Sequence, residues 1–123
     1  METITNPVTD FSDIKDHRLL PNLNVLIGKY LNRYGYSDVN VIGKIISVRG
    51  NSFVTIKRIK AERDTSVKLD FHVGGFSAHC SNQHAQKWNF TETDETFEVR
   101  LSKGYLRSVR IQNEPHEFYD YNF

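Results

Sequence analysis

The strongest constraint on the fold is a pair of β-branched segments that flank a Gly-Asn dipeptide. Residues 39–49, VNVIGKIISVR, and residues 52–60, SFVTIKRIK, are rich in Val and Ile, and Gly50 and Asn51 separate them. β-branched residues favour strands, and a two-residue connection of Gly and Asn favours a tight antiparallel turn. These residues therefore predict a β-hairpin and, with it, an antiparallel sheet.

Further segments are expected to extend this sheet. In residues 66–73, SVKLDFHV, apolar side chains alternate with Lys, Asp and His, which is the pattern of a half-buried strand. Residues 87–91, KWNFT, predict another strand followed by a polar turn, TETDE, and the alternation in residues 97–101 predicts the next strand. Residues 106–112 close the expected sheet. Residues 39–112 are thus predicted to form an antiparallel body of about five strands, strongly bent or closed into a small barrel.

Residues 21–35 predict an amphipathic helix. Pro21 suits the first helical turn, where its missing N–H costs nothing, and Gly35 is a suitable C-terminal stop. Between them the apolar residues fall at helical spacing and form one stripe: Leu23, Leu26, Ile27, Tyr30, Leu31 and Tyr34. The predicted fold class is therefore α+β, with this one helix packed on the antiparallel sheet.

The length favours one domain. A chain of 123 residues can bury a core without disulfides or metals, and no repeat or linker divides it. We expect residues 1–123 to form a single domain, with an N-terminal arm at 1–20 and an acidic, aromatic tail at 113–123. The single cysteine, Cys80, cannot form an internal disulfide, which favours a reducing compartment. Since no apolar run could span a membrane and no signal-peptide core is visible, a cytoplasmic protein with no membrane partner is expected.

Residues 71–88, FHVGGFSAHCSNQHAQKW, contain three histidines and the only cysteine. A zinc site usually takes four ligands from two closely spaced pairs, and this chain has no C-x-x-C pair. In a strand, His79 and Cys80 would point to opposite faces, whereas Cys80 and His84 could meet across a turn. A cysteine nucleophile needs an oriented base, and no protease motif surrounds Cys80. We therefore expect a core cysteine beside a polar loop, with no catalytic residue, no metal ligand and no cofactor.

Charge is unevenly distributed along the chain, although the formal net charge is only +1. Residues 39–112 hold twelve Lys and Arg against seven Asp and Glu, whereas residues 113–123 hold three acids and no Lys or Arg. A curved sheet with basic side chains on one face can follow a phosphate backbone, but strand parity also scatters neighbouring residues over both faces. The candidate nucleic-acid-binding residues are Lys44, Arg49, Lys57, Arg58, Lys60, Arg107 and Arg110.

The hairpin segment GKIISVRGNSFVTI, residues 43–56, resembles the strand–glycine–strand core of small SH3-like or KOW barrels. The resemblance covers about a tenth of the chain. It implies a small barrel and carries no functional residue over to this protein.

Residues 113–123, NEPHEFYDYNF, combine acids with aromatic side chains. A short acidic segment that ends in Phe resembles the tails of bacterial single-stranded-DNA-binding proteins, which implies docking into a basic, apolar pocket of a partner protein. The long linker before such tails is missing here, and the acids are sparser. Two alternatives follow: the tail packs onto the domain as a last strand or arm, or it is exposed for interaction. The candidate partner-binding residues are Phe118, Tyr119, Tyr121 and Phe123.

These features support two functional hypotheses. In the first, the chain is a small non-enzymatic protein that binds a protein partner, of the inhibitor, immunity or accessory type. Aromatic residues and Arg dominate the energies of such interfaces, and no catalytic constellation is visible. In the alternative, the basic sheet face binds single-stranded or structured nucleic acid. Nothing in the sequence specifies an oligomeric state.

Overall fold

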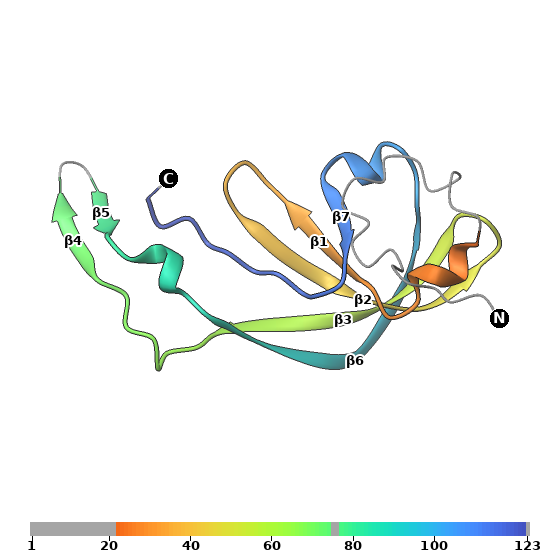
Figure 1. The fold of residues 1–123 in the computed structure, drawn as a ribbon, viewed down its shortest axis with the longest axis horizontal. Helices are drawn as coiled ribbons and strands as arrows, with labels where there is room; N and C mark the ends of the chain where they lie inside the picture. Colours follow the sequence, from red (N-terminus) through yellow and green to blue (C-terminus); the bar gives the residue numbers. More distant parts are fainter. Residues whose placement is uncertain (1–21, 75–76, 123) are drawn as a thin grey trace, which may run out of the picture.

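A computed structural model describes residues 22–74 and 77–122, and their main element is a strongly bent antiparallel sheet (Figure 1). Its strand order is β6-β3-β2-β1-β7, so the last strand returns to lie beside the first. The strands are β1 (Tyr30–Tyr34), β2 (Val39–Arg49), β3 (Phe53–Arg63), β6 (Trp88–Arg100) and β7 (Val109–Gln112). A two-stranded hairpin, here named the β4–β5 arm, projects at one end and consists of β4 (Phe71–Gly74) and β5 (Ser77–Cys80). A short 3-10 turn, η2 (Leu23–Leu26), precedes β1, and two more lie between later strands, namely η3 (Gln83–Ala85) and η4 (Tyr105–Arg107).

The predicted hairpin is confirmed. β2 and β3 pair antiparallel, with Arg49 opposite Phe53 next to the turn. The connection includes Ser52 as well as Gly50 and Asn51, so it is one residue longer than the predicted turn. Gly50 in that turn has a φ of +60°, a conformation that residues with a Cβ atom adopt only at a cost. The local sequence therefore specifies both the two strands and the reversal between them.

The predicted helix over residues 21–35 is wrong, and with it the α+β fold class. The described residues contain no α-helix: Leu23–Leu26 form the 3-10 turn η2, and Tyr30–Tyr34 form β1. Gly28, with a φ of +91°, separates the two elements. β1 is hydrogen-bonded on one side to β2, which follows it in the chain, and on the other to the distant strand β7, so these two strands satisfy its backbone groups. The described chain is thus mostly antiparallel sheet.

Two strand predictions are too long. Residues 66–70 lie outside any strand, so only the end of the predicted strand 66–73 belongs to β4, in the arm. The predicted closing strand 106–112 begins only at Val109, because Tyr105–Arg107 form η4. In both segments only the last residues belong to a strand, and the residues before them are irregular or form a 3-10 turn.

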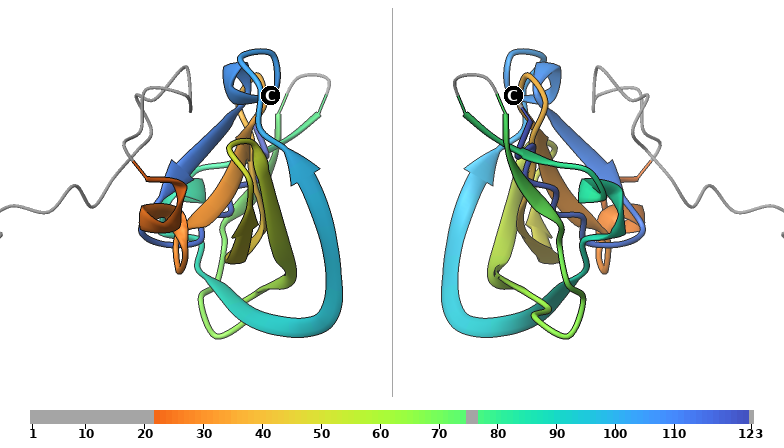
Figure 2. Two further views of the ribbon diagram at one scale, coloured as in Figure 1. Left: turned by 90° about the vertical axis from the view of Figure 1, so that its right-hand side faces the viewer. Right: turned by 90° about the vertical axis from the view of Figure 1, so that its left-hand side faces the viewer.

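The run TETDE is not a turn, as the sequence predicts, but lies inside β6. Residues 93–95 bulge there opposite the single residue Arg58 of β3, and the Thr93 hydroxyl donates a hydrogen bond to the Arg58 carbonyl at 2.9 Å. A bulge bends its strand and increases the local twist. β6 is accordingly strongly curved, as Figure 2 shows.

The core lies between the bent sheet and its connecting turns. Its buried residues are Leu23, Leu26, Leu31, Ile45, Val54, Ile56, Leu101, Leu106, Val109 and Ile111. On β3 the core residues Val54 and Ile56 share one face, whereas Ile59 is buried on the opposite face and lies outside this cluster. The sheet is therefore bent enough for β3 to bury different faces toward its two ends.

Candidate protein-interaction surface

Residues 113–122, here named the strap, run in extended form from the end of β7 toward the β4–β5 arm (Figure 1). The strap forms one bridge with the start of β2. Val39 N–H donates to the Phe118 carbonyl at 2.9 Å, and Phe118 N–H donates to the Val39 carbonyl at 2.8 Å. Glu117 accepts two more hydrogen bonds, from the Val41 N–H at 2.9 Å and from the Asn40 side-chain amide at 3.0 Å. The tail thus packs onto the sheet.

Side-chain amides hold the backbone of the strap. Asn32, buried in β1, donates to the Glu114 carbonyl at 3.0 Å and accepts the His116 N–H at 2.9 Å. Gln86, just after η3, donates to the Tyr119 carbonyl at 2.9 Å and accepts the Tyr119 N–H at 3.0 Å. A side-chain amide offers the same donor and acceptor as a peptide unit, so these two residues bind the strap as a neighbouring strand would.

The end of the strap is joined to the arm. The Asn122 side chain accepts the Cys80 N–H and donates to the Cys80 carbonyl, both at 2.7 Å. Cys80 is buried and its neighbour His79 is exposed, as opposite faces of a strand require. Within residues 22–74 and 77–122, no group of three or more His, Cys, Asp or Glu side chains is arranged to hold a metal ion.

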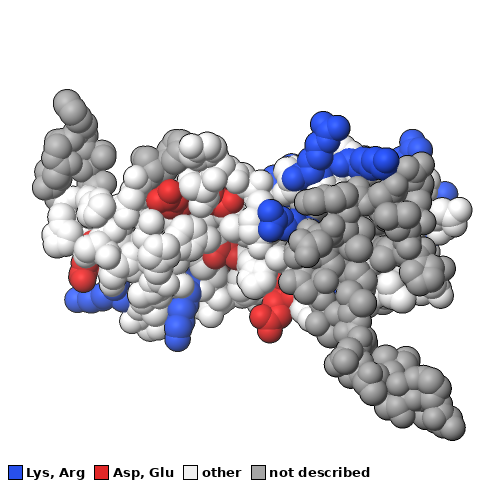
Figure 3. All heavy atoms as spheres, turned by 45° about the horizontal axis from the view of Figure 1, so that its top comes forward, with Lys and Arg blue, Asp and Glu red and all other residues white. Residues whose placement is uncertain are grey.

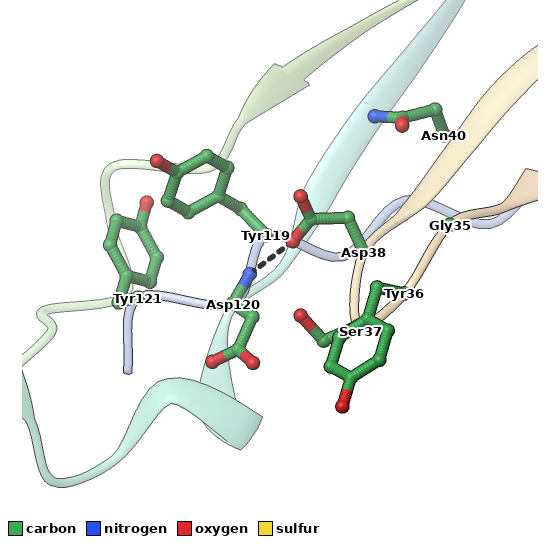
Figure 4. Close-up of a pocket in the computed structure, with 8 residues that line it drawn as sticks. All are labelled: Gly35, Tyr36, Ser37, Asp38, Asn40, Tyr119, Asp120 and Tyr121. Atoms are coloured by element: carbon green, nitrogen blue, oxygen red, sulfur yellow. Dashed lines mark hydrogen bonds between the residues drawn. The ribbon is translucent and has the colours of Figure 1, made fainter. Parts of the chain in front are cut away.

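A shallow pocket of about 310 Å³ lies between the β1–β2 turn and the strap (Figure 4). Turn residues 35–38 and Asn40 of β2 line one side, and strap residues 119–121 line the other. In Figure 4 the carboxylates of Asp38 and Asp120 lie between the ring of Tyr36 and the neighbouring rings of the strap tyrosines. The pocket therefore presents two acids among three aromatic rings.

The two aspartates have different roles in the pocket. Asp120 N–H donates to Asp38 Oδ1 at 2.7 Å and so fastens the strap to the turn. The hydrogen bond from the Asn122 N–H, at 2.9 Å, lowers the pKa of Asp120 below its ordinary value, and bonds from Ser37 and Gln83 lower it further. The carboxylate of Asp120 is therefore ionised and already accepts hydrogen bonds from its own protein. Among the described residues, the second oxygen of Asp38 accepts no hydrogen bond.

Exposed aromatic side chains lie at this pocket and beside it. Tyr36 is 94% exposed, Tyr119 is 52% exposed, and Phe71 of the arm is 50% exposed. The ring of Tyr121 connects two of them, since its centroid lies 4.7 Å from Tyr119 and 5.2 Å from Phe71. Exposed aromatic residues at neighbouring positions are typical of interaction sites.

The predicted partner-binding residues occupy different positions on this surface. Tyr119 is exposed and Tyr121 is half-buried beside it. Phe118 is also half-buried and stacks on His84 with 5.6 Å between ring centroids, so it anchors the strap. Phe123 lies outside the described residues. Sequence reasoning missed Tyr36 and Asp38, for which the signal is an aromatic residue inside a polar turn, YGYSD.

Most of the candidate nucleic-acid-binding residues are paired with carboxylates. Lys44 and Lys57 face each other across β2 and β3, and both approach Glu92, at 3.6 and 3.9 Å. Arg49 donates two hydrogen bonds to Glu98, at 2.9 and 2.8 Å, and these bonds lower the pKa of that carboxyl. The paired cations are partly neutralised on the surface of the sheet.

Of the other four candidates, two also lie beside carboxylates and two do not. Arg58 lies 3.1 Å from Glu95, and Lys60 lies 3.8 Å from Glu62. Arg110 covers the ring of Tyr34, and Arg107 is exposed in η4. On the face drawn in Figure 3, several Lys and Arg side chains gather at the upper right, while the acids lie in the left half and the middle. No continuous basic track along the sheet is evident from these positions.

Comparisons of the chain with known protein families, with curated proteins and with solved structures found no match. In the part of the chain that the structure describes, no helix has the length and apolar character needed to cross a membrane.

Proposed function

We propose that the protein is a small, non-enzymatic binding protein whose protein partner docks on the surface formed by the β1–β2 turn, the strap and the arm. The observation that carries this proposal is that Tyr36 and Tyr119, both at least half exposed, line one pocket, and that the half-exposed ring of Phe71 packs against Tyr121 of the same pocket. Aromatic side chains provide large contact area with few rotatable bonds, and they dominate the energies of many interfaces. A partner of the inhibitor, immunity or accessory type fits this arrangement.

Nucleic-acid binding is the less favoured function. Five of its seven candidate residues have a carboxylate within 4 Å, which weakens their attraction to phosphate. A sheet that binds single-stranded nucleic acid typically presents exposed rings beside its cations. Here Phe53 and Phe97 are instead covered by the guanidinium groups of Arg49 and Arg58, at 4.2 and 4.7 Å.

Affinity capture with matched variants tests the proposal. The full-length protein is immobilised and exposed to a lysate of the cells that produce it, alongside the variants Tyr36→Ala and Tyr119→Ala. Both side chains are at least half exposed, so neither change is expected to alter stability by more than about 0.5 kcal/mol. A partner should be retained by the wild type and lost, or at least tenfold reduced, with each variant.

Ile46→Ala is the control, because Ile46 is 40% exposed and lies six residues along β2 from Asn40, roughly 20 Å away. The control should retain the partner. Equal recovery by the tyrosine variants, or a lysate from which the wild type captures nothing, contradicts the proposal. Recovery that nuclease treatment abolishes supports nucleic-acid binding instead.

A further inference from the structure

We propose that the pocket between the β1–β2 turn and the strap binds a cationic side chain, a guanidinium or ammonium group, presented by a basic segment of the partner. This inference rests on the proposed function, because it specifies which chemistry of the docked protein enters the pocket. It follows from the kinds of residue that line the pocket and from the way this protein binds its own arginines.

The pocket places negative charge where a cation can reach it. Asp38 and Asp120 contribute a carboxylate each, and both belong to the lining. Asp120 is already engaged by the Asn122 N–H, whereas Asp38 uses only Oδ1, to accept the Asp120 N–H at 2.7 Å. In Figure 4 the other oxygen of Asp38 faces away from this bond, on the side where Tyr119 and Asn40 lie. An arriving N–H donor therefore finds an acceptor that no described residue occupies.

Aromatic rings complete the arrangement. The rings of Tyr119 and Tyr121 lie 4.7 Å apart at 59°, and Tyr36 lies across the pocket from them in Figure 4. Aromatic faces attract cations within about 6 Å of the ring centre, and the attraction adds to that of a nearby carboxylate. Phenol rings next to two aspartate side chains are thus suited to a cation and unsuited to an anion.

The same protein already holds two arginines in this way. The guanidinium of Arg49 lies 4.2 Å from the centre of the Phe53 ring and donates two hydrogen bonds to Glu98. The guanidinium of Arg58 lies 4.7 Å from the Phe97 ring and 3.1 Å from Glu95. In both cases one ring and one carboxylate bind a single guanidinium. The pocket offers the same combination of ring and carboxylate, and no arginine is among the described residues that line it.

The size of the pocket favours a side chain over a larger ligand. Its volume of about 310 Å³ lies at the low end of the range of ligand pockets, about 300–1,000 Å³. It is also shallow and bounded by two segments of extended or turning backbone, so a peptide can lie across it and insert one residue. Arginine fits best, because its planar group can stack on a ring and pair with a carboxylate at once.

Titration of the isotope-labelled protein with the peptide acetyl-Gly-Gly-Arg-Gly-Gly-amide, followed by NMR, tests the inference. The amide signals of residues 35–40 and 119–121 should shift, with a Kd of about 1 mM, as expected for one side chain. The matched peptide carries citrulline in place of Arg, which keeps the shape and removes the charge. It should bind at least tenfold more weakly.

Asp38→Asn isolates the charge, because the amide that replaces the carboxylate keeps a carbonyl oxygen, which can still accept the Asp120 N–H and hold the strap. The Arg peptide should bind this variant at least tenfold more weakly, and Asp94→Asn, at an exposed acid in the β6 bulge, should bind it normally. Equal affinity for the citrulline peptide, unchanged affinity in Asp38→Asn, or no shift at tenfold the expected Kd overturns the inference. If partner capture still depends on Tyr36 and Tyr119 in that event, the docking surface stands and only its cationic ligand is wrong.

Discussion

Gln86 is the residue whose loss should most directly loosen the strap. Its side chain donates to the carbonyls of Tyr119 and Gln83, both at 2.9 Å. It accepts hydrogen bonds from the Tyr119 N–H at 3.0 Å and from Trp88 Nε1 at 2.8 Å. Gln86→Ala removes all four bonds, and two of them join the strap to the rest of the protein.

The expected magnitude follows from those two bonds. A hydrogen bond within a protein contributes about 0.5–1.5 kcal/mol net, so opening of the strap should become easier by about 1–3 kcal/mol. This range corresponds to an opening equilibrium about 5- to 160-fold larger. The bonds to Trp88 and Gln83 lie within one loop and affect strap opening only indirectly.

Hydrogen exchange of individual amides measures this change. The Phe118 and Tyr121 amides are suitable reporters, since they donate to Val39 O and Gln83 Oε1 and keep these acceptors in the variant. Both should exchange faster by the factor given above, while the amides that pair β2 with β3 stay protected.

Asn89→Ala is the matched control, because Asn89 is an exposed amide in β6, three residues from Gln86, with no side-chain hydrogen bond to the described residues. It should leave exchange of the strap within about twofold of the wild type, in line with the small effects of surface substitutions. Unchanged protection of Phe118 and Tyr121 in Gln86→Ala would refute the view that amide–backbone pairing holds the strap.

Three further outcomes are expected. A Cβ atom at Gly43 would overlap the Ile56 side chain and the neighbouring backbone carbonyl of β3. Gly43→Ala should therefore lower the free energy of unfolding, measured with urea, by about 1–3 kcal/mol. A decrease below about 0.5 kcal/mol contradicts this packing. The pKa of Asp120 is depressed in the folded state, so its contribution to stability is present above the unfolded pKa, near 3.9, and is lost as pH falls through the folded value. NMR titration of that carboxyl should give a pKa below the ordinary one. The buried Cys80 thiol should react with a disulfide reagent much more slowly in native protein than in denaturant, and equal rates contradict its burial.

The hairpin could be predicted because its information is local. Gly50 supplies the positive φ of the turn, and Val and Ile on both sides favour strands. The helix prediction failed at residues that the sequence correctly marked as apolar: Leu23, Leu26 and Leu31 are all buried. A stripe of period 3.6 and a turn followed by a strand can bury the same three leucines. What decides between them is the pairing of β1 with β7, which lies about eighty residues away and leaves no local signal.

The acidic run in β6 was misjudged for a related reason. Asp and Glu are depleted in strands, so TETDE reads as a turn when taken alone. In the sheet, Glu92 lies near Lys44 and Lys57, and Glu95 lies near Arg58. Opposite charges on neighbouring strands favour the pairing that propensity disfavours. The same contacts place carboxylates beside three of the basic residues of the body.

The composition of the tail predicted an unusual segment but not its environment. Its aromatic residues were visible in the sequence, whereas the amides of Asn32 and Gln86 that bind its backbone are ordinary polar residues there. Such residues become informative only when the fold brings them beside the strap. Tyr36 and Asp38 are likewise assembled into a site by a segment more than eighty residues away.

The strap and the pocket are coupled, because strap residues 119–121 form one wall of the pocket. A ligand that needs this wall binds only the closed form, and at ten times its Kd it stabilises that form by about 1.4 kcal/mol. This stabilisation of the closed form is comparable to the free energy of about 1–3 kcal/mol by which Gln86→Ala is expected to ease opening of the strap. The Arg peptide should therefore restore much of the lost protection at Phe118 in Gln86→Ala, and the citrulline peptide should not. If both peptides restore the protection of Phe118 equally, closure of the strap does not depend on charge in the pocket. If neither peptide restores it, closure of the strap is not coupled to binding in the pocket.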